Sequence, residues 1–305
     1  MNNLKDNMIT NEGYTVFVET VFQMVSKELG EQFIVREECA DKNNDTIRWG
    51  VSIFDLKDES KEVHISPTIY LEEYYKKYVE GCELAKIVKH IIQLYYEVKS
   101  PFQFALEDFA FDNMKDKICF KLINQHMNVK VLEGMPHRKF CDLAVAYYVQ
   151  IIDDERGIGT IPVNNSLMMF WDVDESNLWE LAYKNTRNLL TPNFQTVKDA
   201  IYECTGEVIE DGMSTFTLSN ERRHFGAAIV LYEETLHNVA EMLQASYYLL
   251  PSSIHEWFVL VDDGKPDPES CNALVDFVNR SQLSLEEILS DHAYYYDREQ
   301  RKILY

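Results

Sequence analysis

The sequence predicts an α+β protein of two packed α+β modules, the second of which ends in a ferredoxin-like βαββαβ unit. Three features of the chain lead to this fold class. Residues 84–98 repeat apolar side chains at helical spacing, residues 46–54 alternate apolar and polar side chains as a strand does, and residues 226–297 follow the element order of a split βαβ unit. The chain therefore mixes helices and strands along its whole length.

We place the two modules at residues 1–112 and 113–305. The chain has 305 residues, 46% of them hydrophobic, which is enough to bury a core in each module. Pro101 and a mixed acidic and aromatic stretch interrupt the periodicity at residues 100–115, where a boundary between modules is expected.

The first module is expected to combine a hairpin with helices on either side of it in the sequence. Its predicted elements are helix 14–29, strands 33–39, 46–54 and 63–65, and helices 71–79 and 84–98. Gly30 is a natural end for the first helix, and Asp41-Lys42-Asn43-Asn44-Asp45 is a hairpin loop. The last helix is the most clearly amphipathic one in the chain.

The second module opens with strands and helices and then becomes more regular. Its first predicted elements are strands 117–122, 142–152 and 158–163 and helices 165–171, 175–186 and 196–204. The ferredoxin-like unit is expected to consist of strand 226–232, helix 233–244, strands 246–250 and 256–262, helix 268–280 and strand 291–297. The turn Asp262-Asp263-Gly264 ends the third strand of this unit.

The charge balance limits the classes of partner. The 51 acidic and 29 basic residues give a net charge of −22, which disfavours direct binding to a nucleic-acid backbone. A mimic of nucleic acid requires a continuous stripe of carboxylates. No apolar run is long enough to span a bilayer, and the first residues lack the hydrophobic region of a signal peptide. We therefore expect a cytoplasmic protein without a membrane partner.

Cofactor and metal motifs are missing from the sequence. The six cysteines are scattered without a C-x-x-C pair, and the phosphate-binding loop, the G-x-G-x-x-G fingerprint, the G-x-S-x-G elbow and H-E-x-x-H do not occur. We expect neither a cofactor nor a bound metal. The basic segment Glu221-Arg222-Arg223-His224 is interpreted as a solvated loop rather than an anion site.

Polar residues gather at the starts of two predicted strands. His255 and Glu256 begin the third strand of the ferredoxin-like unit, and Asp291 and His292 begin the fourth. In the usual strand order 4-1-3-2 these two starts lie at one end of the sheet, about 10 Å apart. Because neighbouring residues of a strand face opposite sides, at most one member of each pair joins a given site.

Three interpretations of this cluster remain open. The first is structural, with serines capping a turn and His255 satisfying buried groups. The second, which we favour for function, is a non-enzymatic binding or regulatory protein that recognises a protein or small ligand. Its candidate binding residues are Ser252, Ser253, His255, Tyr294 and Tyr296. The third is a hydrolase or metal-dependent enzyme in which His255 acts with Glu256, Asp291 or His292.

Four short segments resemble a bacterial family that is catalogued only as a domain of unknown function, number 5688, and is often found near mobile elements. The segments are Pro67-Thr68-Ile69-Tyr70-Leu71, Pro136-His137-Arg138, Leu250-Pro251-Ser252-Ser253-Ile254-His255-Glu256 and Leu289-Ser290-Asp291-His292. They occur in the same order over nearly the whole chain. The resemblance implies a complete protein, and it implies no activity, cofactor or catalytic residue.

Overall fold

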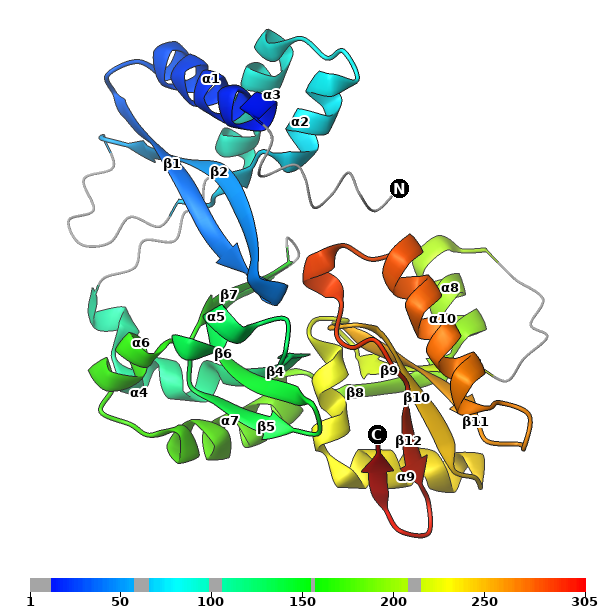
Figure 1. Cartoon of the computed structure of the whole chain (residues 1–305). Coiled ribbons are helices and arrows are strands. Elements are labelled where there is room, and N and C mark those ends of the chain that lie inside the picture. The colour runs from blue at the N-terminus through cyan, green and yellow to red at the C-terminus, as the bar shows by residue number, and fades with distance from the viewer. Residues whose placement is uncertain (1–11, 58–65, 99–105, 155–156, 208–214) are drawn as a thin grey trace. The chain divides into compact units, whose positions relative to one another are not determined.

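The computed structural model describes residues 12–57, 66–98, 106–154, 157–207 and 215–305 (Figure 1). The chain forms two compact units. Unit 1 runs to Lys42 and continues from Thr46 to Asn113, and unit 2 comprises Asn43–Asp45 and Met114–Tyr305. The strand expected at residues 63–65 lies outside the described residues.

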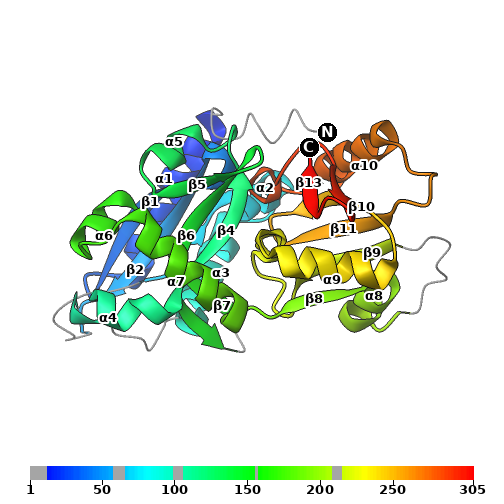
Figure 2. The same cartoon turned by 90° about the horizontal axis from the view of Figure 1, so that it is seen from below.

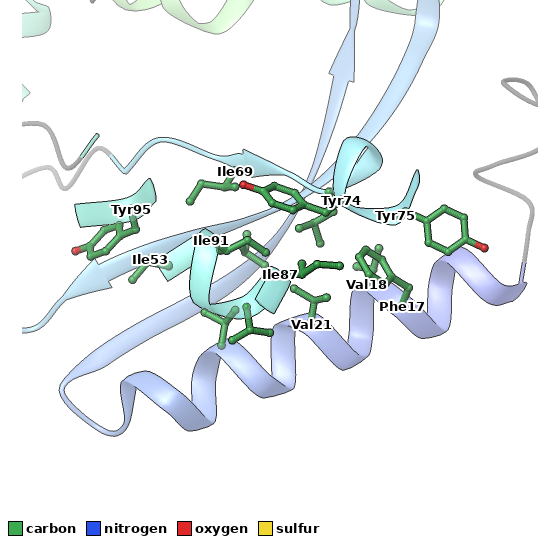
Figure 3. Packing of buried hydrophobic residues seen from close by; sticks show 14 of the residues in the cluster. Phe17, Val18, Val21, Ile53, Ile69, Tyr74, Tyr75, Ile87, Ile91 and Tyr95 are labelled. Atoms are coloured by element: carbon green, nitrogen blue, oxygen red, sulfur yellow. The ribbon is translucent and has the colours of Figure 1, made fainter. Parts of the chain in front are cut away.

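Unit 1 packs helices against a small antiparallel sheet. Its elements are α1 (Glu12–Leu29), β1 (Phe33–Lys42), β2 (Thr46–Asp55), β3 (Ile69–Tyr70), α2 (Glu72–Val79) and α3 (Leu84–Val98), and the strand order is β1-β2-β3. The apolar stripe of α1 contributes Val21 to the core, β2 contributes Ile53, and α3 contributes Ile91 (Figure 3). The helical and strand periodicities thus converge on one apolar core.

The first half of unit 2 is built on a four-stranded antiparallel sheet. The 3-10 turn η3 (Leu106–Phe109) and all but the last residue of α4 (Phe111–Met114) still belong to unit 1, whereas η4 (Lys115–Lys117) and η2 (Asn43–Asp45) belong to unit 2. The following elements are β4 (Ile118–Asn124), α5 (Val129–Glu133), β5 (His137–Phe140), β6 (Leu143–Asp154), β7 (Gly157–Pro162), α6 (Asn165–Phe170) and α7 (Glu175–Leu189). Strand β6 pairs with β4, β5 and β7.

The second half of unit 2 forms a six-stranded antiparallel sheet. Its elements are β8 (Pro192–Thr196), α8 (Val197–Thr205), β9 (Thr215–Asn220), η5 (Gly226–Leu231), α9 (Glu233–Leu243), β10 (Tyr247–Ser253), β11 (Glu256–Val261), α10 (Pro268–Ser281), η6 (Leu285–Glu287), β12 (Tyr294–Asp297) and β13 (Lys302–Leu304). The strand order is β13-β12-β10-β11-β9-β8. Figure 2 shows the two sheets of this unit beside one another.

Helices α9 and α10 lie on opposite faces of the six-stranded sheet (Figure 1). The alternation along β10 explains this arrangement. The Tyr247 hydroxyl donates to the Leu236 carbonyl of α9, whereas Leu250 packs with Cys271 and Val275 of α10. The sheet is therefore buried on both sides along its central strand.

The α+β class is confirmed, but the ferredoxin-like unit is not. The strand predicted at residues 226–232 was wrong, because Gly226–Leu231 form the 3-10 helix η5. All six residues of η5 are buried, and a continuous apolar run does not distinguish a strand from a buried helical segment. Strands β11 and β12 run parallel to each other, as expected, but the strand between them is β10.

In the part of the chain that the structure describes, none of the helices combines the length and the apolar character that crossing a bilayer demands.

Candidate functional site

The two serines of the predicted site fasten the turn between β10 and β11. The Ser253 hydroxyl accepts a hydrogen bond from the backbone N–H of His255 at 3.0 Å, and the Ser252 hydroxyl donates to Glu256 at 3.2 Å. Both serines are buried. A shift in the strand register between Pro251 and Ser253 accompanies the turn. Their hydroxyls and Glu256 therefore hold the conformation that presents His255.

His255 is held by the segment that precedes η5. Its Nδ1 accepts from the backbone N–H of Phe225 at 3.0 Å, and its ring stacks on the Phe225 ring with an interplanar angle of 8°. Because Nδ1 accepts, the neutral ring carries its proton on Nε2. Burial lowers the pKa of His255; the Glu287 carboxylate opposes this effect, and the Lys121 charge adds to it. His255 is therefore a neutral imidazole at pH 7.

His224 lies beside His255, with ring centroids 6.0 Å apart. Asn220 clamps its backbone, accepting from the His224 N–H at 3.1 Å and donating to the His224 carbonyl at 2.8 Å. Burial lowers the pKa of His224 to about 4, and the charges of His255, Lys121 and Arg222 act in the same direction. We refer to Lys121, Tyr148, Arg222, His224, Phe225 and His255 as the His255 cluster.

His292 belongs to a second set of polar residues. Its Nδ1 lies 3.0 Å from Asp291 Oδ1 and 3.2 Å from the Ser290 hydroxyl, and its Nε2 lies 3.8 Å from Asp142 Oδ2. The Tyr294 hydroxyl donates to Asp142 at 2.6 Å and also lies 3.1 Å from the Ser290 hydroxyl. We refer to Asp142, Ser290, Asp291, His292 and Tyr294 as the His292 cluster.

The two predicted tyrosines belong to the core on the α9 side of the sheet. Tyr294 meets Trp257 edge to face at 5.4 Å, and Tyr296 stacks on Tyr247 at 5.1 Å. Both tyrosines are at most 2% exposed, so in this conformation neither offers contact area to a partner. Their aromatic bodies stabilise the sheet, and the Tyr294 hydroxyl orders the polar cluster above it.

The structure thus divides the predicted site between two clusters. It brings Asp291, His292 and Tyr294 together and gives His255 a different set of partners. Glu256 interacts with Ser252. Across the described ranges, no group of three or more histidine, cysteine, aspartate or glutamate side chains has the arrangement needed to hold a metal ion.

Sequence reasoning missed residues that come from distant segments. Asp142 lies 152 positions before Tyr294, and it reaches the cluster from the two-residue turn between β5 and β6. Cys141 in that turn has φ of 55°, a left-handed conformation that usually selects glycine. Because this two-residue turn was not predicted and its backbone conformation is visible only in the structure, nothing in the sequence pointed to Asp142. Lys121 is a lone basic residue among the apolar residues of β4, and this feature was overlooked.

A surface cavity of about 470 Å³ lies at the other end of β12. Arg298 forms a bidentate pair of hydrogen bonds with the Glu241 carboxylate there, at 3.0 and 3.3 Å, and also donates to Gln244 at 3.1 Å. The hydrogen bond from Arg298 lowers the pKa of Glu241, although burial opposes it slightly. The Arg298 guanidinium is already hydrogen-bonded to protein acceptors. We therefore interpret Arg298 and Glu241 as a structural ion pair that joins α9 to the β12–β13 turn.

Comparison with known proteins adds one finding. Among curated proteins and among solved structures, no significant match to the chain was found. A model of a family of unknown function, DUF5688, matches residues 14–298. This match covers nearly the whole chain and agrees with the resemblance of the four short segments. The chain therefore belongs to DUF5688, a family of unknown function.

Proposed function

We propose that the protein is a non-enzymatic binding protein and that the surface formed by the His292 cluster recognises a positively charged partner. The observation that carries this proposal is the hydrogen bond between Tyr294 and Asp142, which fixes a turn of the first sheet against the start of β12. A fixed carboxylate needs no ordering when a partner binds, and this lowers the entropic cost of association.

The exposed side of the cluster has the composition of a cation-binding surface. Asp291 is 94% exposed in its side chain, and the Asp142 carboxylate is partly accessible. The Tyr305 ring, which is 67% exposed, lies 6.2 Å from the Tyr294 ring. Carboxylates beside an aromatic face attract ammonium and guanidinium groups. The net charge of −22 also speeds the approach of a basic partner.

The surroundings of the nucleophilic side chains support binding rather than catalysis. Ser290 has no exposed surface, and its hydroxyl is engaged by Tyr294 and His292. Burial raises the pKa of the nearby Cys141 to about 11, with a further contribution from Asp142, so its thiol stays protonated at neutral pH. A buried hydroxyl and a protonated thiol are poor nucleophiles.

The proposal includes a cytoplasmic location. Five cysteines that the structure describes, at positions 39, 82, 119, 141 and 271, are free thiols. Free thiols at both exposed and buried positions fit a reducing compartment, where disulfides do not persist.

Binding of a labelled oligolysine peptide tests this function. Fluorescence anisotropy would compare the full-length protein with a variant that carries Asp142→Asn and Asp291→Asn, at physiological ionic strength. Each lost charge contact is expected to weaken binding by about 1 kcal/mol, so the double variant should lose more than tenfold in affinity. The amide oxygen that replaces the Asp142 carboxylate still accepts from Tyr294, so the fold is preserved.

The control removes the same number of charges elsewhere. Glu180 and Glu269 are exposed on α7 and α10, and the variant Glu180→Gln, Glu269→Gln should bind the peptide within about twofold of the wild type. Equal losses in the two double variants would show that only the overall charge matters, and the proposed surface would then be abandoned.

A hydrolase is the second candidate function. The observation in its favour is the order Ser290, His292, Asp142, which places a hydroxyl 3.2 Å from one ring nitrogen and a carboxylate 3.8 Å from the other. The hydrolysis of p-nitrophenyl acetate by the wild type and by Ser290→Ala would separate the two functions. We expect equal, background rates. A rate that depends on Ser290 would replace the binding proposal with an enzymatic one.

A further inference from the structure

Basic side chains from three segments converge in the His255 cluster. Lys121 comes from β4, Arg222 and His224 from the turn after β9, and His255 from the turn between β10 and β11. The Lys121 ammonium lies 4.7 Å from the centre of the Phe225 ring, and the centre of this ring lies 4.1 Å from that of His224 and 5.6 Å from that of His255. Such a gathering of cationic and N–H-bearing groups is unexpected in a chain with a net charge of −22.

Two buried polar atoms in this cluster have no hydrogen-bond partner. They are His224 Nε2 and the Tyr148 hydroxyl, two of several such atoms in the described part of the chain. The Tyr148 and His224 rings lie 6.2 Å apart. Burial raises the pKa of Tyr148, and the nearby Cys119 thiol adds to this effect, but the two side chains do not meet the geometry of a hydrogen bond. Buried polar groups are almost always paired, so these two atoms point to a bound group.

The backbone around the cluster is held tightly. Asn220 clamps His224, the Ser219 hydroxyl donates to the His255 carbonyl at 2.8 Å, and Phe225 adopts φ of 50°. A Cβ atom on Gly226 would lie 2.5 Å from that carbonyl, so the turn fits this position only as glycine. A left-handed residue held by its neighbours is a common feature of binding sites.

Among the described residues, the carboxylates of Asp153 and Glu287 border the cluster. Asp153 is engaged by Arg222 and by the Gln150 amide, which donates to it at 3.0 Å. Glu287 is close enough to His255 to oppose, in part, the burial that lowers the pKa of this histidine. Both histidines are partly exposed as residues, although the Nε2 atom of His224 itself is buried.

We infer that the His255 cluster is a binding site for a phosphate-type oxyanion, presented by free phosphate or by a small phosphomonoester. Lys121 and Arg222 supply charge, and His224, His255 and Tyr148 supply N–H and O–H donors. The oxyanion would accept from the two atoms that otherwise lack a partner. It would also favour protonation of His224, whose charged form is disfavoured without it. This site uses none of the residues of the His292 cluster, so it stands independently of the proposed function.

Nuclear magnetic resonance of the histidine side chains in the full-length protein tests the site. Inorganic phosphate at millimolar concentration should shift the ring signals of His224 and His255 and raise the pKa of His224 from about 4 toward its ordinary value. Lys121→Gln should weaken phosphate binding about tenfold. Lys139→Gln removes the same charge from an exposed position on β5 and should leave binding unchanged.

A comparison of two ligands, inorganic phosphate and a sugar phosphate, identifies which compound supplies the oxyanion. A sugar phosphate that binds more tightly than phosphate supports a phosphomonoester ligand, and the reverse order supports free phosphate. The inference is overturned if neither compound shifts the two rings, or if Lys121→Gln and Lys139→Gln lose affinity equally. A thermal unfolding curve of Lys121→Gln checks that the variant is folded, and His255→Gln, which should also weaken phosphate binding, supplies a second test.

Discussion

The His255 cluster and the His292 cluster place the same side chain in opposite surroundings. His255 lies among basic groups and stacks on Phe225, and its pKa is lowered by burial. His292 lies between Asp142 and Asp291 and is partly accessible. One cluster suits an oxyanion and the other suits a cation. The comparison shows that residue type alone does not define a site, because partners from distant segments decide its charge.

The two clusters also differ in how they are built. The His255 cluster depends on backbone conformation, with Phe225 in a left-handed conformation and Gly226 pressed against a carbonyl. The His292 cluster depends on side-chain hydrogen bonds, among them the one from Tyr294 to Asp142. Substitutions should therefore affect the first through steric strain and the second through lost hydrogen bonds, and the steric effects should be larger.

The largest expected effect is that of Gly226→Ala. The added methyl group would lie 2.2 Å from the Ser219 hydroxyl and 2.5 Å from the His255 carbonyl, and the backbone cannot move away easily. We expect a loss of about 3 kcal/mol in the free energy of unfolding, measured by urea denaturation. Gly134→Ala is the matched control, because its nearest neighbour would lie at 3.6 Å, an ordinary contact. A loss below about 1 kcal/mol for Gly226→Ala would show that the turn is adaptable.

The importance of Gly226 could not be predicted from the sequence, whereas many helices and strands could. Helix α3 and helix α10 were predicted by apolar spacing, and α10 also begins with a capping Asp267 followed by proline. Strands β8 and β9 were both missed. Thr215–Asn220 does alternate polar and apolar residues and was overlooked, whereas Pro192–Thr196 carries no such alternation. Tertiary pairing, rather than local preference, makes that segment a strand.

The second effect is a dependence of stability on pH that comes from His224 and His255. The pKa of His224 is lowered to about 4 in the folded state, mainly by burial, and the pKa of His255 is lowered too. The unfolded chain binds more protons below about pH 6.5, so this stability is fully present above that pH and is lost as the pH falls toward 4. We expect a loss of about 2 kcal/mol over this window, after allowance for solvent screening.

Urea denaturation at a series of pH values measures this effect. The variant His224→Gln should have a flatter profile between about pH 6.5 and 4 than the wild type. An unchanged slope in the variant would assign the acid sensitivity to other groups. Millimolar phosphate provides a further comparison, since an oxyanion in the His255 cluster should also flatten the profile of the wild type.

The chemical composition of each cluster could be predicted only in part. The segment from Ser252 to Glu256 and the segment from Ser290 to Tyr294 were recognised as unusually polar, and both do form polar networks. Their partners Asp142 and Lys121 belong to the other sheet of unit 2. A strand pattern assigns a residue to a face of its own sheet, and it contains no information on which loop of a second sheet will meet that face.

The smallest expected loss of stability is that of Tyr294→Phe, and it tests how the His292 cluster is held together. The substitution keeps the buried ring against Trp257 and removes only the hydroxyl that donates to Asp142. We expect a loss of about 1.5 kcal/mol in the free energy of unfolding, because the hydrogen bond is buried at one end and its acceptor is charged. Tyr295→Phe is the control, since its hydroxyl donates to Asp262 at 2.8 Å from a more exposed position, and it should lose about 0.5 kcal/mol. Equal losses would mean that the Tyr294 hydroxyl does not order the cluster, and the fixed position of Asp142 would then lose its physical basis.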